Sequence, residues 1–285
     1  MLAMTRRVLF SAAHADWLPE KSAAENAALF GPNATPEPYG NTYHLDVTVT
    51  GEIDPMTGII VNIKDIDQVV RALVVEKLDR KFVNRSVAYF SDRPVTPGTL
   101  LGYIREQLQD ALPPAVRLTA LRLEETPLHF AEWQESERRE ERERGSMLLT
   151  RVYEFAASHR LHSPHLSDEA NRELFGKCNY PHGHGHNYIL EVTVAGTVDP
   201  GTGRVCDETA LDECVNREVV DRYDHRHFNY DIPEFADLIP STEVVTKMIW
   251  DRLKTHIPAP ARLYRVVVRE TARNIFEYRG EENGS

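Results

Sequence analysis

Short stretches of alternating apolar and polar residues mark the strands in the second half of the chain. They cover residues 151–159 and 187–198, and two more follow at 263–272 and 274–278. A period of two in segments rich in β-branched residues is typical of half-buried strands. The turn residues Asp-Pro-Gly-Thr-Gly at 199–203 favour a strand hairpin after the second segment.

Two segments between these strands, 210–223 and 241–253, have apolar residues at helical spacing. The apolar positions of the first segment are Leu211, Cys214, Val215, Val219 and Val220. The second opens with Ser-Thr-Glu, a favourable N-cap, before its apolar face. The order ββααββ predicts an α+β fold in which an antiparallel sheet carries both helices on one face.

The chain repeats itself without gaps at an offset of 145 residues. His14 aligns with His159, and GEIDPMTG at 51–58 aligns with GTVDPGTG at 196–203. Self-similarity of this length indicates that one domain occurs twice. The two occurrences are called the first and the second repeat below.

The repeat divides the 285 residues into two domains and a connector. We expect one domain over residues 1–133, a charged linker over 134–146 and a second domain over 147–285. The connector is too polar to bury a face, and its charges suit a flexible linker or a solvated helix. With 41% hydrophobic and 27% charged residues, the composition is that of a globular protein and excludes a disordered or collagenous chain.

The net charge of −11 argues against a general affinity for nucleic acid or for an anionic membrane. A phosphate-bearing ligand would therefore need a local basic pocket. No apolar run approaches the roughly 20 residues of a membrane helix, so no membrane partner is expected. The three cysteines form no even-numbered disulfide framework, which favours a reducing, cytoplasmic location.

The densest chemistry lies in KCNYPHGHGHNY at 177–188, where histidines alternate with glycines. Residues two apart on a strand face the same side, so these imidazoles can converge on one ion. His159, on another predicted strand, would join His184 and His186 as a third nitrogen ligand and leave one position open. Three protein ligands and an open position are typical of catalytic zinc.

The first repeat serves as an internal comparison for this cluster. It has Tyr39 and Asn41 where the second repeat has His184 and His186, although His14 is retained. A single histidine cannot hold a divalent metal tightly. We therefore expect the first repeat to lack zinc.

Cys178 follows Lys177 and precedes the histidine cluster, a setting that favours the reactive thiolate. The alternative is a small, inert, apolar side chain, which is our interpretation of Cys206 and Cys214. Asp224 and His225 follow a predicted helix, and a carboxylate beside an imidazole can orient the ring. A surface cluster explains that pair equally well.

These separated motifs resemble the 6-pyruvoyltetrahydropterin synthase family. The resemblance covers about 130 residues of the second repeat, from FAASHRL at 155–161 to YRVVVRETARNIFEYRG at 264–280. It implies a zinc-dependent lyase that eliminates triphosphate from 7,8-dihydroneopterin triphosphate to give 6-pyruvoyltetrahydropterin. The first repeat resembles a degenerate member of the family.

The resemblance also implies roles for individual residues. His159, His184 and His186 would hold Zn²⁺. Cys178 would accept a proton from the substrate side chain, with Asp224 and His225 as its relay.

The implied substrate anchor is Glu270, which would bind the pterin ring, with Thr242 as a weaker candidate. Glu125 of the first repeat aligns with Glu270 and could hold a pterin-like ring. The substrate phosphates need cations, and the candidates are Arg160, Lys177 and Arg273.

Other functions remain open at this level. His182 adds a histidine before the usual His-Gly-His, so the register Cys-x3-His-Gly-His also resembles the related 6-carboxytetrahydropterin synthase of the queuosine pathway. A zinc-bearing pterin-binding module without catalysis is a further alternative. A zinc hydrolase is disfavoured because no HExxH motif is present.

The resemblance implies the tunnelling fold, in which sheets of neighbouring subunits join and active sites lie at their interfaces. We therefore expect a homo-oligomer with sites at domain or subunit interfaces. In such an assembly the first repeat would act as an architectural partner.

Overall fold

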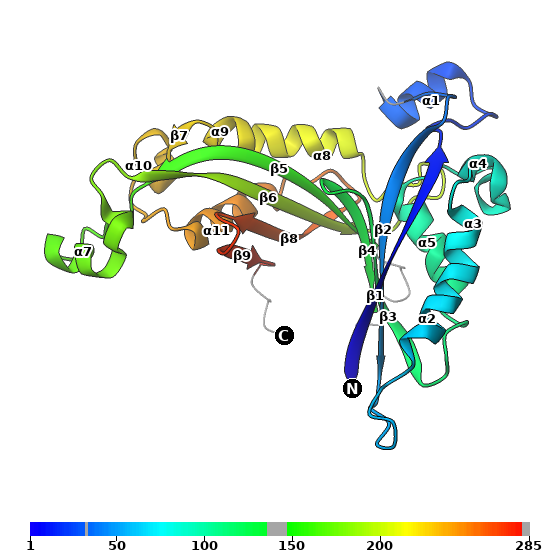
Figure 1. Ribbon diagram of the computed structural model, residues 1–285. Helices are drawn as coiled ribbons and strands as arrows, with labels where there is room; N and C mark the ends of the chain where they lie inside the picture. The colour runs from blue at the N-terminus through cyan, green and yellow to red at the C-terminus, as the bar shows by residue number, and fades with distance from the viewer. Residues whose placement is uncertain (32–33, 136–146, 281–285) are drawn as a thin grey trace. The chain divides into compact units, whose positions relative to one another are not determined.

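The computed structural model describes residues 1–31, 34–135 and 147–280 (Figure 1). The chain forms two compact units. Unit 1 comprises Met1–Thr150 with Ala195–Cys206, and unit 2 comprises Arg151–Val194 with Asp207–Ser285. Residues 136–146 of the predicted linker lie outside the described residues. In the part of the chain described, no helix combines the length and the hydropathy needed to span a membrane.

Unit 1 contains the helices and strands of the first repeat. In chain order they are β1 (Leu2–His14), α1 (Ala23–Phe30), β2 (Tyr39–Gly51), α2 (Ile63–Val70), the π-helical turn η2 (Arg71–Val75), α3 (Glu76–Leu78), α4 (Val83–Ser86), η3 (Ala88–Phe90), α5 (Pro97–Leu108), β3 (Val116–Thr126) and β4 (His129–Gln134). The strands pair antiparallel in the order β1-β2-β3-β4. The helices α2 to α3 and α5 lie on one face of this sheet (Figure 1).

Unit 2 contains the elements of the second repeat. They are β5 (Met147–His159, whose first residues belong to unit 1), α7 (Asp168–Phe175), η4 (Gly176–Asn179), β6 (His184–Gly196), α8 (Glu208–Val215), η5 (Asn216–Val220), α9 (Asp221–Tyr223), β7 (Arg226–His227), α10 (Phe228–Asp231), η6 (Pro233–Phe235), α11 (Thr242–Leu253), β8 (Arg262–Arg269) and β9 (Ile275–Tyr278). The strand order is β5-β6-β8-β9, and the two-residue strand β7 pairs parallel with β5.

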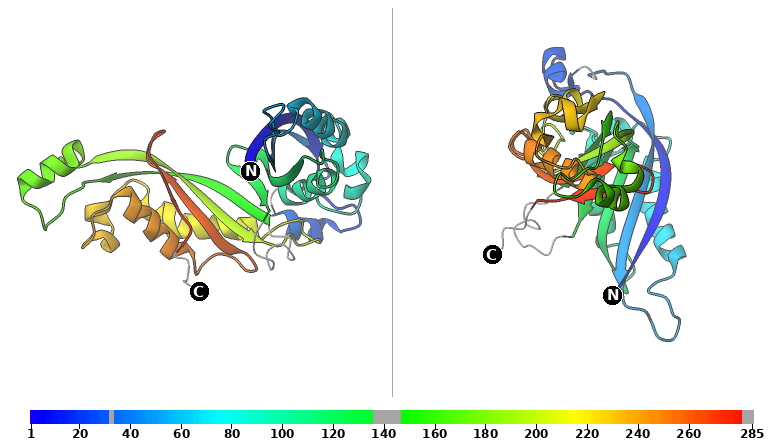
Figure 2. Two further views of the ribbon diagram at one scale, coloured as in Figure 1. Left: turned by 90° about the horizontal axis from the view of Figure 1, so that it is seen from below. Right: turned by 90° about the vertical axis from the view of Figure 1, so that its left-hand side faces the viewer.

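The core of unit 2 lies between its sheet and its two main helices. The alternation predicted from sequence puts Tyr188, Leu190 and Val192 of β6 on the buried face. Leu211 of α8 and Ile249 of α11 are also fully buried. Figure 2 shows both helices on the same face of the strands. The predicted α+β fold, with antiparallel main strands and helices on one face, is confirmed.

The prediction of a strand hairpin at 199–203 is wrong. The turn itself forms, since the Asp199 amide donates to the Arg204 carbonyl and the Gly203 amide to the Asp199 carbonyl. However, the chain then enters α8 rather than a second strand. The reason is the Asp207 side chain, which accepts hydrogen bonds from the Thr209 and Ala210 amides and so caps the helix.

The sequence patterns did not reveal a short helix inserted between the first two strands of each repeat. In the second repeat this is α7, and it depends on Asn171, which is fully buried. The Asn171 side chain accepts from the Ser163 amide at 2.7 Å and donates to the carbonyls of Ser163, Leu166 and Ser167. Asn26 makes the equivalent bonds to Leu18, Lys21 and Ser22 in the first repeat.

Replacing Asn171 with alanine should open this segment, because buried backbone groups would lose their partners at about 1–3 kcal/mol each. We expect amide hydrogen exchange over residues 161–179 to become roughly 10- to 100-fold faster, as measured by mass spectrometry. The neighbouring exposed Arg172→Ala variant serves as the control. Unchanged exchange in Asn171→Ala would show that the asparagine does not hold the segment.

Candidate functional site

Three histidines of unit 2 converge where β5 ends and β6 begins. His159 is the last residue of β5, and His184 and His186 are the first and third residues of β6. Their potential ligand atoms all lie within 4.8 Å of one another, and the Nε2 atoms of His159 and His184 are 3.2 Å apart. The spacing of two therefore has the predicted effect for these residues, whereas His182 precedes the strand and is exposed.

The two glycines of the HGHGH motif stand where the neighbouring strand leaves little room for a side chain. Gly183 has a φ of +70°, and a Cβ there would lie 2.5 Å from the His159 carbonyl oxygen. A Cβ on Gly185 would lie 3.1 Å from the Ala157 carbonyl oxygen. Glycine is therefore required for β6 to approach β5 closely enough to bring the imidazoles together.

His159 is oriented from behind by the backbone. It is almost completely buried, and its Nδ1 donates to the Pro240 carbonyl at 2.8 Å. This bond leaves the Nε2 lone pair directed at the other histidines. Burial lowers the pKa of both His159 and His186, which favours the neutral imidazole that binds metals.

These residues fit a zinc ion. Nitrogen ligands about 2.0–2.1 Å from a tetrahedral zinc lie roughly 3.3 Å from each other, close to the separation of the His159 and His184 nitrogens. The His186 Nε2 atom is buried without a hydrogen-bond partner among the described residues. A carbonyl orienting the far side of His159 is the usual outer-shell support of a metal-binding imidazole.

Glu270 and Thr242 lie next to the histidine cluster. The Glu270 Oε1 atom lies 3.8 Å from His159 Nε2 and 3.7 Å from His186 Nε2. Oε1 also accepts from the Thr242 hydroxyl at 2.6 Å, and Oε2 accepts from Asn274 at 2.9 Å. Burial raises the pKa of Glu270, but these hydrogen bonds and the histidines outweigh it and hold the carboxyl below its usual pKa.

Cys178 lies on η4, close in sequence to the cluster and half-buried. Its carbonyl accepts from the Leu161 amide at 2.9 Å, and the Asn179 side chain donates to the Leu161 carbonyl. These bonds attach the turn that carries Cys178 to Leu161, which follows His159 by two residues. Within the described residues the Cys178 thiol makes no hydrogen bond.

Asp224 and His225 form a pair on the segment that follows α9. The His225 Nδ1 atom lies 2.8 Å from Asp224 Oδ2, and the Ala156 amide donates to Asp224 Oδ1 at 2.7 Å. His225 has a positive φ of 56°, and its side chain is 84% exposed. No described contact joins this pair to Cys178, so the structure does not bring the predicted relay together within one chain.

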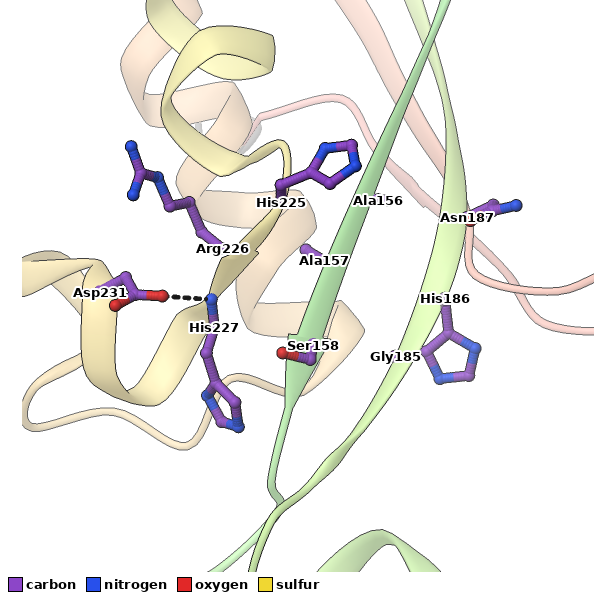
Figure 3. A pocket seen from close by; sticks show the side chains of 10 residues that line it. All are labelled: Ala156, Ala157, Ser158, Gly185, His186, Asn187, His225, Arg226, His227 and Asp231. Carbon is purple, nitrogen blue, oxygen red and sulfur yellow. Dashed lines mark hydrogen bonds between the residues drawn. The ribbon is translucent and has the colours of Figure 1, made fainter.

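An open pocket of about 720 Å³ runs beside β5 and β6, and His186 and His225 are among its lining residues (Figure 3). At its edge the His227 amide donates to Asp231 at 2.7 Å. Unit 1 has a pocket of about 420 Å³ lined by the aligned positions, with Arg80 in place of His225. The duplication thus extends to the shape of the surface.

The three candidate phosphate-binding residues differ in the contacts of their side chains. Arg160 donates to the Asn179 carbonyl and contacts His162, so it has a structural role. Lys177 and Arg273 are exposed.

The first repeat fills the equivalent site with its own hydrogen bonds. His14 Nε2 lies 3.0 Å from the Tyr39 hydroxyl, which donates to Asp16 at 2.8 Å. Glu125, the counterpart of Glu270, accepts from Asn41 and Tyr43 on one oxygen and contacts His129 on the other. Glu125 therefore has fewer free acceptor positions than Glu270, and its binding of a pterin ring stays a prediction.

Sequence reasoning missed three supporting residues: Pro240, Asn274 and Asp16. Pro240 acts through its carbonyl, which leaves no side-chain signal. Asn274 and Asp16 reach the two sites from loops, and no periodicity marks them. Asp16 aligns with Leu161 of the second repeat. This replacement of an apolar residue by a charged one is the sequence signal that could have identified Asp16.

Fold and site define an α+β protein, built from two similar halves, with a histidine cluster suited to a metal ion in one of them. The family model described as 6-pyruvoyl tetrahydropterin synthase matches residues 3–136 and again residues 148–281. The chain therefore belongs to this family and contains its domain in tandem.

Curated relatives agree with this assignment. The chain is 47% identical over 133 residues to 6-pyruvoyl tetrahydrobiopterin synthase of Homo sapiens, covering 47% of this chain and 91% of the relative. It is 31% identical over 120 residues to 6-carboxy-5,6,7,8-tetrahydropterin synthase of Bacillus subtilis, covering 40% and 77%. A solved 6-pyruvoyl tetrahydropterin synthase from Caenorhabditis elegans has 41% identity and a TM-score of 0.46, covering 48% of this chain and 96% of that one.

Proposed function

We propose that the protein is a zinc-dependent lyase that eliminates triphosphate from 7,8-dihydroneopterin triphosphate to give 6-pyruvoyltetrahydropterin. The observation that carries this proposal is the cluster of His159, His184 and His186 beside the ionised carboxyl of Glu270. The names of the relatives support the same reaction. The lack of an even-numbered disulfide framework supports a cytoplasmic location.

Each group has a separate part in this proposal. The three histidines hold the zinc ion, which when bound polarises the substrate hydroxyls and makes the adjacent C–H more acidic. Glu270, fixed by Thr242 and Asn274, accepts hydrogen bonds from the N–H groups of the pterin ring. Cys178 takes the proton from the side chain of the substrate.

The pair of Asp224 and His225 serves the cysteine of a neighbouring subunit in this proposal. Among the described residues no contact joins His225 to Cys178, and the exposed imidazole of His225 is accessible to a second chain. Asp224 fixes the imidazole through Nδ1. The other ring nitrogen, Nε2, is then the one that can exchange a proton with a thiol.

The test is incubation of the purified zinc-loaded protein with 7,8-dihydroneopterin triphosphate, followed by mass analysis of the products. We expect release of triphosphate and a product with the mass of 6-pyruvoyltetrahydropterin. The relative from Bacillus subtilis makes 6-carboxytetrahydropterin the second candidate, and its product has a different mass. Substrate that binds and is recovered intact would contradict both enzyme functions and would favour a pterin-binding module.

A further inference from the structure

The pocket of about 420 Å³ in unit 1 is the cationic counterpart of the pocket in unit 2. Each residue that lines it aligns with a lining residue of unit 2 at the offset of 145. Arg80 and Lys81 stand where unit 2 has His225 and Arg226. Among the described residues the lining in unit 1 includes no carboxylate, whereas that in unit 2 includes Asp231. A chain with a net charge of −11 therefore concentrates positive charge at this pocket.

Arg80 has a strained backbone conformation at the edge of this pocket. Its φ is +55°, in the left-handed region that residues other than glycine, asparagine and aspartate rarely adopt. The Arg80 amide donates to the Ser11 carbonyl at 2.6 Å, and the Ser11 amide donates to Asp79 Oδ1 at 2.9 Å. These bonds fix the turn to β1. Because strained residues cluster at ligand sites, a long cationic side chain at this position points to a ligand.

The pocket offers hydrogen-bond donors that the described residues do not use. The Arg80 side chain is 90% exposed, and its ion pair joins Nε to Asp79 Oδ2 at 3.7 Å, which leaves both terminal nitrogens for a ligand. The exposed Lys81 ammonium has no ion pair within the part of the chain described. The Ser11 and Thr42 hydroxyls lie 3.1 Å apart. Since one hydroxyl donates to the other, the second keeps its proton for a ligand.

Two cations and a hydroxyl pair form a donor set that suits an anion with several oxygen atoms. The volume of the pocket lies in the range of about 300–1,000 Å³ that is typical of small-molecule sites, so it can take a chain of phosphates. We propose that this pocket binds a polyphosphate anion. Arg80 and Lys81 are its cations, and the hydroxyls of Ser11 and Thr42 supply the neutral donor.

This site is separate from the site of the proposed reaction. All of its residues belong to unit 1, and the histidine cluster and Glu270 belong to unit 2. Binding of a polyphosphate by unit 1 therefore needs neither zinc nor turnover. It can be measured in a chain whose zinc site has been removed.

Calorimetric titration of the full chain with inorganic triphosphate tests the proposal. Every protein in the series carries His184→Ala, because a bound zinc ion would itself attract triphosphate. The ionic strength is kept at about 0.05 M, since salt screens exposed charges. We expect one saturable site per chain. Arg80→Gln and Lys81→Gln should each weaken binding by roughly 5- to 30-fold, as expected for loss of a charge-assisted hydrogen bond in an open pocket.

The control is Arg71→Gln, which removes the same charge from an exposed residue of η2 outside the pocket. Its affinity for triphosphate should stay within about twofold of the parent. Absence of a saturable site would overturn the proposal. An equal loss of affinity in Arg71→Gln would also overturn it, because net charge alone would then explain the binding.

A comparison of anions identifies the part of the ligand that is recognised. Inorganic monophosphate should bind at least tenfold more weakly than triphosphate, because one phosphate cannot reach both cations and the hydroxyls at once. Equal affinity of the two anions would contradict a polyphosphate site. The third anion is 7,8-dihydroneopterin triphosphate. An affinity equal to that of triphosphate would identify the free anion as the occupant, and an affinity at least tenfold higher would identify a larger ligand held by its phosphate chain.

Discussion

His184→Ala should abolish zinc binding and, with it, turnover. The substitution removes the nitrogen that lies 3.2 Å from His159 Nε2 and leaves two protein ligands in place of three. Even changes to groups behind a ligand typically cost 10- to 100-fold in metal affinity, so loss of a ligand should exceed about 100-fold. We expect the metal content measured by atomic emission to fall from one zinc per chain to none.

His182→Ala is the matched control for this prediction. It removes a histidine from the same motif that the structure places before β6 and outside the cluster. Zinc content and turnover should both stay at the parent level. If His182→Ala lost zinc while His186→Ala kept it, the alternative register with ligands at 182 and 184 would be correct.

Cys178→Ala should separate metal binding from proton transfer. The thiol lies on η4 rather than among the converging imidazoles, so the variant should keep its zinc and its affinity for the substrate. Loss of a positioned general base typically costs 10²–10⁴ in rate, and we expect kcat to fall by about that factor. The measurements are triphosphate release under saturating substrate and zinc content of the same sample.

The control for the cysteine is Cys214→Ala, which removes a thiol from the core of unit 2 that donates to the His256 carbonyl. Its kcat should stay within about twofold of the parent once the folded fraction is matched. Full turnover by Cys178→Ala would assign the proton transfer to another group. A joint loss of zinc and turnover would instead give Cys178 a role in holding the metal site.

The sequence predicted the sheet, the two main helices and the shared face of His184 and His186 because each depends on local periodicity. Alternation along β6 places His184 and His186 on one face together with the buried Tyr188 and Leu190. The same reasoning failed where contacts join distant residues. The helix α7 depends on a buried asparagine, and the position of the Asp224–His225 pair depends on how the chain after α9 returns to β5.

The hairpin error has a similar origin. Turn residues at 199–203 signal a reversal of the chain, but they do not determine whether a strand or a helix comes next. Asp207, four residues after the turn, caps a helix and so determines that α8 follows. The hydrogen bonds of Glu125 could likewise not be predicted from the sequence, because its partners Asn41, Tyr43 and His129 come from two different strands.

The polar interior of the first repeat has a consequence for how the two halves respond to trace elements. His14, Tyr39 and Asp16 hydrogen-bond to one another, so under our expectation that this half lacks zinc, metal scarcity would leave its folding free energy unchanged. A ligand stabilises only the structure that binds it, so under the proposed function the concentration of free zinc would act on the folding of the second half. One polypeptide would then combine a half whose stability is independent of zinc with a half whose stability rises with the zinc supply.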